Sequence, residues 1–309
     1  MIVSSHRPQG ARLFFTLRGS ILTKIWRELA VCIAVASAVT LSRGTIFEWK
    51  VTLTAVPFSL IGLALAIFLG FRNNAAYDRY WEARKLWGEL VHRSRSLARQ
   101  LLGLAAAPSP GVVDLRVAMI RRTIALAHTL RHQLRGSDPA IEIQPWLAAG
   151  EAQAVARSRW RADALLRHMG ADLGALVRAG AIEAPLAAEV DATISAMCAV
   201  AAGCERIQGT PIPFPYTLLL HRTASLYCFL LPFGLVDTIG IMTPFVVAIV
   251  AYTFFGLDAV GTEIEEPFSL AVHHLPLTSI CRTIEINLRE ALGERDLPPL
   301  LAPEDGQLD

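Results

Sequence analysis

The longest uncharged stretch of the chain, Val51 to Phe71, constrains the fold more than any other feature. Its sequence is VTLTAVPFSLIGLALAIFLGF. As a helix it would rise about 1.5 Å per residue and span about 32 Å, which is enough to cross the hydrocarbon layer of a bilayer. The sequence RNNAAYDRYWEARKLWG follows directly and contains no proline that would end a helix. We therefore predict a transmembrane helix that continues as a helix beyond the membrane.

The composition also favours a membrane protein. Hydrophobic residues make up 53% of the chain and charged residues 18%, whereas soluble domains carry roughly 25% charged residues. The net charge of +2 gives no general attraction to nucleic acid, so no nucleic-acid partner is expected. The five cysteines show no CxxC spacing, so we expect reduced thiols, and the N-terminus lacks the pattern of a removable signal peptide.

No motif in the sequence indicates catalysis. The chain contains no nucleophile elbow, phosphate-binding loop or dinucleotide-binding glycine pattern. We therefore expect no enzyme activity, no catalytic residue and no cofactor. His128 and His132 lie four residues apart on a predicted helix, which is a possible zinc spacing. Because no third ligand is evident, a solvated helix face is the simpler interpretation, and no metal site is expected.

Three further spans are expected. The stretch from Leu29 to Ser42 is uncharged over 14 residues and crosses a bilayer only if Ile25 and Trp26 extend it. The stretch from Thr223 to Leu257 is too long for one span and fits two helices. The break between them falls in VDTIGIMTP, which contains Asp237, a turn-forming glycine and the pair Thr-Pro as a cap and first helical position.

Basic residues set the predicted orientation. They are concentrated before the first span and after the second, and the positive-inside rule places such segments in the cytoplasm. We therefore expect a multi-pass membrane protein with both termini in the cytoplasm. The residues concerned are Arg7, Arg12, Arg18, Lys24 and Arg27, and then Arg72, Arg79, Arg84, Lys85, Arg93, Arg95 and Arg99.

The segment from Glu89 to Arg206 differs in kind, because it is charged and rich in Ala, Leu and Arg. Its periodicity indicates amphipathic helices and lacks the alternation of strands. The prediction is an all-α protein with four transmembrane helices and a cytoplasmic helical bundle. The expected segments are an N-terminal cytoplasmic segment (1–24), the first two spans with the extension of the second (25–103), a cytoplasmic helical region (104–212), the last two spans with a following segment (213–292), and a disordered tail (293–309).

The second span carries two stripes of period four. Gly62, Ala66 and Gly70 form a small-residue stripe, which commonly allows neighbouring helices to approach closely. A large apolar stripe lies beside it, formed by Leu63, Ile67 and Phe71. This second stripe could face lipid, a partner helix or the axis of a pore, and the residues alone favour the first two. In a pore, three such rings would form a dry throat of roughly 11 Å that gates by dewetting.

The residues after Phe71 are typical of a helix leaving a bilayer, with basic and aromatic side chains at headgroup depth. Arg79 and Glu82 are spaced to pair along the helix. Two asparagines directly after the apolar stretch are unusual, and they suggest amides that bind partners or ions. The residues concerned are Arg72, Asn73, Asn74, Tyr77, Arg79, Glu82 and Trp87.

Three long segments resemble one known family. PFSLIGLALAIFLGFRNNAAYDRYWEARKLWG resembles the second-helix signature of bacterial bestrophins, and GCERIQGTPIPFPYTLLLHRT and MTPFVVAIVAYTFFGLDAVGTEIEEPF are similar to two later segments of that family. The order, the spacing and the plan of four spans agree from about Arg18 to Leu292. The resemblance implies a homopentameric ion channel with one central pore, in the lipid bilayer of a bacterial inner membrane.

The resemblance also implies roles for particular residues. Leu63, Ile67 and Phe71 would form the apolar neck of the pore, which raises the pore-axis interpretation of that stripe above the others. Pro185 would lie at the second, cytoplasmic constriction, although relatives have an aliphatic residue there. The residues from Arg72 to Trp87 would form the pore edge and the cytoplasmic framework.

The resemblance to bacterial bestrophins implies a channel for cations, so the expected function is passive conduction of Na⁺ and K⁺. The acidic run of the eukaryotic calcium clasp is missing, so we expect opening without calcium. An anion channel of the same architecture is the alternative, and a non-conducting membrane scaffold or enzyme is a further one. Glu263, Glu265 and Glu266 could line a vestibule that attracts cations, or they could pair with arginines of a neighbouring helix.

Overall fold

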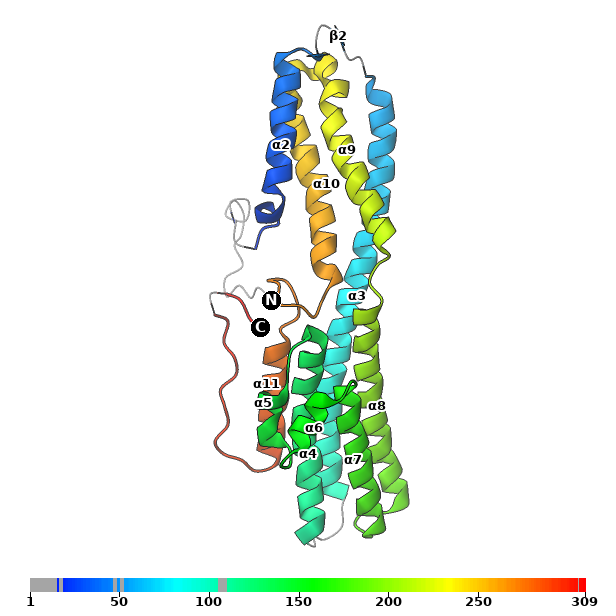
Figure 1. Cartoon of the computed structure of the whole chain (residues 1–309), viewed down its shortest axis with the longest axis vertical. Coiled ribbons are helices and arrows are strands. Elements are labelled where there is room, and N and C mark those ends of the chain that lie inside the picture. The colour runs from blue at the N-terminus through cyan, green and yellow to red at the C-terminus, as the bar shows by residue number, and fades with distance from the viewer. Residues whose placement is uncertain (1–15, 17–18, 47–48, 51–52, 105–109, 305) are drawn as a thin grey trace. The chain divides into compact units, whose positions relative to one another are not determined.

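The computed structural model describes residues 16, 19–46, 49–50, 53–104, 110–304 and 306–309, and it is helical almost throughout this part (Figure 1). A two-residue antiparallel hairpin, β1 (Thr45–Ile46) with β2 (Trp49–Lys50), follows the first labelled helix. The described helices are α2 (Leu22–Leu41), α3 (Ala55–Leu104), α4 (Pro110–Arg135), α5 (Ala140–Ile143), η1 (Gln144–Trp146), α6 (Glu151–Arg157), α7 (Arg161–Arg178), α8 (Ala184–Gly209), α9 (Phe214–Ile239), η2 (Gly240–Met242), α10 (Thr243–Glu265) and α11 (Leu277–Ala291). The prediction of an all-α protein is confirmed.

The chain forms two compact units. The first, which we call the apolar unit, consists of the described part of His6–Tyr80 together with Pro211–Glu266. The second, which we call the amphipathic unit, consists of the described part of Trp81–Thr210 together with Pro267–Asp309. Helix α3 contributes its first part to the apolar unit and its remainder to the amphipathic unit.

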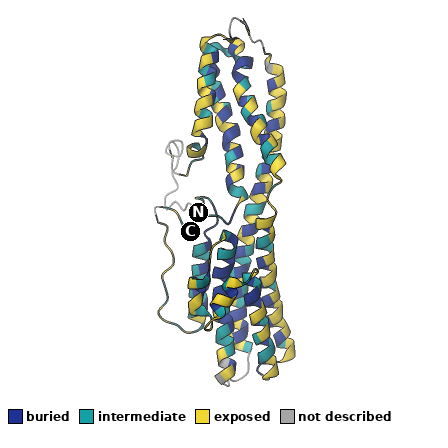
Figure 2. Cartoon of the chain, in the orientation of Figure 1, coloured by how far each residue is buried: buried dark blue, intermediate teal, exposed yellow. Residues whose placement is uncertain are grey.

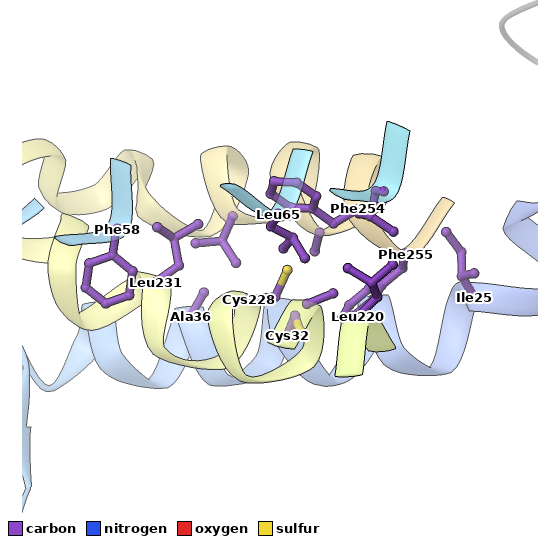
Figure 3. Packing of buried hydrophobic residues seen from close by; sticks show 14 residues of the cluster. Ile25, Cys32, Ala36, Phe58, Leu65, Leu220, Cys228, Leu231, Phe254 and Phe255 are labelled. Atoms are coloured by element: carbon purple, nitrogen blue, oxygen red, sulfur yellow. The ribbon is translucent and has the colours of Figure 1, made fainter. Parts of the chain in front are cut away.

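Four helices surround the core of the apolar unit, and each contributes buried side chains to it (Figure 3). Helix α10 packs against α2 and α9, and α2 also packs against α9. Helix α3 adds Phe58, Leu65 and Leu69 to the same cluster. The glycine Gly234 in α9 allows close packing here, because a Cβ atom at that position would lie 2.7 Å from ring carbons of Phe58.

The outward sides of the apolar unit remain uncovered. Figure 2 shows exposed residues along α2 and α3, and many of these are large and apolar. An apolar surface of this extent is typical of contact with lipid or other subunits. Among the described residues, three stretches are long and apolar enough to cross a membrane, namely Val56–Leu104, Ala184–Gly209 and Phe214–Glu265.

These stretches differ from the predicted spans at two points. Helix α2 does not meet the same measure, because its first two turns contain Lys24, Arg27 and Glu28. Helix α8 does meet it, although the prediction assigned this segment to the cytoplasmic region. In the structure α8 packs against α4 and α7 of the amphipathic unit, so its apolar residues serve a core made by the chain itself.

The helix ends follow the local signals closely. Helix α3 continues past the apolar stretch without interruption, as predicted. Helix α9 ends at Ile239, and Gly240 follows with a left-handed φ of 52°, which confirms the predicted break. The prediction for Thr243 is wrong in detail: it lies inside α10, and its hydroxyl donates to the carbonyl of Gly240 instead of capping the helix. The sequence APSPG also predicts a break between helices at residues 107–111, and this segment falls largely outside the described residues.

The amphipathic unit is a bundle built around α4. Helix α4 packs against α7, α11, α5 and α8, and its side toward them is lined by buried residues from Met119 to Leu130. The segment expected to be a disordered tail ends in Asp309, whose side chain has partners in the amphipathic unit. The Asp309 carboxylate accepts hydrogen bonds from Arg135 at the end of α4 (2.5 Å) and from the hydroxyl of Thr278 at the start of α11 (2.9 Å).

Candidate functional site: an exposed apolar face and a buried charge cluster

The proposed neck residues form an exposed face of α3 in the apolar unit. Leu63, Ile67 and Phe71 are 61%, 48% and 62% exposed, although each is large and apolar. Of the small-residue stripe beside them, Gly62 packs against Tyr227 of α9, whereas Gly70 has no neighbouring atom within 4 Å of a Cβ built there. The chain itself therefore leaves this face of α3 free for lipid, a second copy or water.

Arg72 follows Phe71 directly and is turned about 100° around α3 from it. Its side chain is fully buried, and its guanidinium meets the carboxylate of Asp258 in α10 at 2.5 Å. It also donates to the hydroxyl of Thr262 at 2.7 Å and lies 3.6 Å from the carboxylate of Glu265. The first positive charge after the apolar stretch is therefore paired inside the apolar unit and is not displayed beside the neck face.

Asp258 joins three helices of the apolar unit. One carboxylate oxygen of Asp258 contacts Arg72 of α3. The other lies 2.8 Å from Nδ1 of His221 in α9. The sequence analysis did not identify Asp258, although an acid within an apolar helix is a recognisable signal of function.

The two asparagines after Arg72 lie in different surroundings. Asn73 packs tightly against α10, where a Cβ atom at Gly261 would lie 2.2 Å from its Oδ1 atom. That oxygen is buried and has no hydrogen-bond partner among the described residues. Asn74 is exposed. Only Asn74 is therefore free to meet ions or water on the outer side of the helix.

The three candidate acids at the end of α10 also differ. Glu263 is buried and pairs with Lys24 at 3.1 Å. Glu265 accepts a hydrogen bond from the backbone N–H of Ile212 at 3.0 Å and lies near Arg72. These contacts match the interpretation of ion pairing, while Glu266 remains exposed.

The remaining framework residues fall in both units. In the apolar unit Tyr77 is exposed, and Arg79 donates to the backbone carbonyl of Glu265 at 3.3 Å. In the amphipathic unit Glu82 pairs with Arg206 of α8, so the expected pairing of Glu82 with Arg79 is wrong. Two more lie there: Trp87 is fully buried, so it meets neither solvent nor headgroups, and Pro185 lies exposed in the first turn of α8.

The two histidines of α4 hold a carboxylate. His132 Nε2 lies 2.6 Å from Oε2 of Glu142 in α5, and His128 Nδ1 lies 3.0 Å from Oε1 of the same carboxylate. The expected solvated face is wrong for His128, which is buried because α5 and α11 cover it. Among the described residues, no group of three or more His, Cys, Asp and Glu side chains is arranged to hold a metal ion.

This cluster shifts a pKa. Burial would raise the pKa of Glu142, but hydrogen bonds with His128 and His132 and the nearby charge of Arg131 outweigh burial and hold that pKa well below its usual range. A carboxylate with a lowered pKa stabilises the folded state above its ordinary pKa of about 4.3, and this contribution is lost as the pH falls below that value.

Replacing Glu142 by Gln is therefore expected to destabilise the chain by about 1–2 kcal/mol near pH 7, the range for a partly exposed charged hydrogen bond. Thermal unfolding of the purified protein at several pH values measures this. The difference from the wild type is expected to shrink as the pH falls below about 4. A difference that stays constant with pH would show that the carboxylate charge contributes nothing.

Comparison with known proteins adds to this geometry. The family model described as "Bacterial/Fungal Bestrophin protein" matches residues 1–290. A Mesorhizobium japonicum protein named "Voltage-dependent anion channel-forming protein mll4386" is 44% identical over 301 residues, which cover 97% of this chain and 94% of that protein. A Salmonella typhi protein named "Voltage-dependent anion channel-forming protein YneE" is 40% identical over 300 residues, which cover 96% of this chain and 97% of that protein.

The fold matches a solved structure over most of the chain. The crystal structure of a bacterial bestrophin homologue from Klebsiella pneumoniae, carrying a point mutation, aligns with a TM-score of 0.83 and 37% sequence identity. The match covers 88% of this chain and 100% of that one.

Proposed function

Because the chain belongs to the bacterial and fungal bestrophin family, whose members are ion channels and not enzymes, we propose that it forms a homopentamer that conducts monovalent ions passively through one central pore. In this proposal α2, the first part of α3, α9 and α10 cross the inner membrane of a bacterium, with both termini in the cytoplasm. The amphipathic unit then lies on the cytoplasmic side. Four crossings are consistent with the short connection between α9 and α10.

The observation that carries the proposal is the exposed apolar face of α3. Leu63, Ile67 and Phe71 are uncovered in the single chain and recur at every fourth residue, one turn apart. Around a symmetry axis, five copies of this face would make three stacked apolar rings. Such a throat holds water only weakly, so its width sets the current.

We further propose that the channel prefers cations such as Na⁺ and K⁺. The neck face continues through Asn74 to Asp78, which is exposed and lies seven residues, about two turns, after Phe71. Asp78 is the first charged residue on this face, because Arg72 points away from it and is paired. A ring of carboxylates at the inner end of a neutral throat attracts cations.

An anion channel is the second candidate. The observation in its favour is that the Mesorhizobium japonicum and Salmonella typhi relatives carry the name of anion channel-forming proteins. We also propose that opening needs no calcium. The described loop after α10 contains no run of acidic residues that could bind calcium, and a hydrogen bond between Ser269 and His274 joins its two sides. Pro185 remains the candidate for a second constriction.

The reversal potential in a NaCl gradient decides the sign of the current. The purified protein is reconstituted in planar bilayers of neutral lipid, and the wild type is expected to follow the Na⁺ equilibrium. Replacing Asp78 by Asn is expected to lower the Na⁺ to Cl⁻ permeability ratio several-fold. The matched control replaces the exposed Glu290 of α11 by Gln and is expected to leave the ratio unchanged. A wild-type potential near the Cl⁻ equilibrium would overturn cation selectivity and support the second candidate.

A further inference from the structure

We infer that Asp258 determines ion selectivity by neutralising the buried charge of Arg72 beside the neck. The inference rests on the proposed channel and adds a residue that lies outside the pore face. Arg72 is the residue next to Phe71, the last of the apolar stripe. Its charge therefore lies at the level of the inner neck, turned about 100° around the same helix.

The surroundings of Arg72 make its charge effective at a distance. The side chain is 0% exposed, so no solvent reaches the guanidinium to screen it. The distance to the neck face is on the order of one helix diameter, roughly 10 Å. Coulomb interactions across such a distance are strong where the medium between is protein and not water.

In the folded chain this positive charge is compensated locally. Asp258 provides one carboxylate oxygen at 2.5 Å, together with its backbone carbonyl at 3.2 Å. The nearest other acid, Glu265, lies farther away at 3.6 Å and is shared with the N–H group of Ile212. Asp258 is therefore the nearest counter-charge of Arg72, and its loss would remove one negative charge beside the throat in every subunit and leave Arg72 with the more distant Glu265 alone.

A third side chain contacts the pair of Arg72 and Asp258, because His221 lies against the second carboxylate oxygen of Asp258. Lys24 and Glu263 form a separate ion pair at the same end of α10. The two substitutions considered below leave all three of these side chains in place. Their effect on selectivity therefore reports the charge of the central pair.

The test measures the Na⁺ to Cl⁻ permeability ratio of three variants in neutral bilayers under a NaCl gradient. Asp258→Asn removes the nearest counter-charge of Arg72 and leaves only the more distant Glu265, so the ratio is expected to fall at least about tenfold. Arg72→Met leaves Asp258 uncompensated, and the ratio is expected to rise. The double variant Arg72→Met with Asp258→Asn carries neither charge and is expected to return toward the wild-type ratio. The exposed pair of Asp163 with Arg167 provides the control variant Asp163→Asn, which is expected to change nothing.

Opposite shifts in the two single variants separate electrostatics from structural damage, because a loosened pore would move both ratios in the same direction. If Asp258→Asn fails to assemble, as size-exclusion chromatography would show, the comparison of Arg72→Met with the double variant still decides. Conducting channels whose ratio does not move, or moves the same way in both, would overturn the inference alone. Silent bilayers with intact wild-type oligomers would instead overturn the proposed channel function.

Discussion

The current through reconstituted channels is expected to rise about tenfold or more when Leu63, Ile67 and Phe71 are all replaced by alanine. Three large apolar rings make the throat narrow and hard to hydrate, whereas alanine leaves space for water and ions to pass. A tenfold increase corresponds to a lowering of the barrier by ~1.4 kcal/mol. Single-channel recording in planar bilayers measures the change.

A matched control lies on the same helix. Ile61 and Phe68 are 45% and 50% exposed and are also apolar, but they lie about 110° around α3 from the neck face. Alanine at both positions removes a similar apolar area and is expected to leave the conductance near the wild-type value. An equal increase in this control, or an unchanged current in the neck variant, would refute the assignment of the neck.

Replacing Arg122 by Met is expected to lower the free energy of unfolding by about 3–5 kcal/mol, the cost of breaking a largely buried ion pair from one side. Arg122 of α4 binds two carboxylates of the amphipathic unit, Glu151 of α6 at 2.6 Å and Asp172 of α7. All three side chains are at most 17% exposed. The substitution leaves two facing acids without their cation, and thermal unfolding of the purified protein measures the loss.

The pKa values of Asp172 and Glu151 are shifted in opposite directions, and these shifts make the predicted loss of stability depend on pH. Burial raises the pKa of Asp172 above its usual value even beside Arg122. For Glu151, hydrogen bonds from Arg122 and His168 outweigh burial and lower the pKa. Without Arg122 both acids are expected to take up protons more readily, so the deficit of the variant shrinks as the pH falls toward about 5.

Two comparisons make the result specific. Arg121→Met changes the neighbouring arginine, which is exposed, and is expected to stay within about 0.5 kcal/mol of the wild type. Combining Arg122→Met with Glu151→Gln and Asp172→Asn removes the unpaired charges and is expected to recover part of the stability. A single variant as stable as the wild type at pH 7 would contradict the assigned role of this ion pair.

The sequence predicted those features of the fold that depend on neighbours along the chain. The absence of a helix breaker after Phe71 predicted the continuous helix α3, and a glycine in VDTIGIMTP predicted the end of α9. The apolar stripe of α3 was also visible from its period of four. Local spacing decides each of these, so no knowledge of distant contacts was needed.

The charge cluster of the apolar unit could not be predicted in the same way. Arg72 and Asp258 are separated by 186 residues, so no local spacing relates them. Local spacing indicated a different ion pair, between Arg79 and Glu82 of the same helix. The competing contacts, to the carbonyl of Glu265 and to Arg206, come from helices that pack beside α3 only after folding. The same reason accounts for Asp309, whose partners lie on α4 and α11.

The three-residue connection between α9 and α10 also bears on how the chain enters a membrane. If the helices of 26 and 23 residues cross the membrane as proposed, the three residues Gly240–Met242 are too few to let them lie far apart, because any unpaired backbone group drawn into hydrocarbon would cost several kcal/mol. The two helices are therefore expected to leave the insertion machinery together as one hairpin. Lys50 pairs with Asp237 at 2.9 Å and so links β2 to the end of α9; in the proposed orientation this contact lies at the outer end of the hairpin.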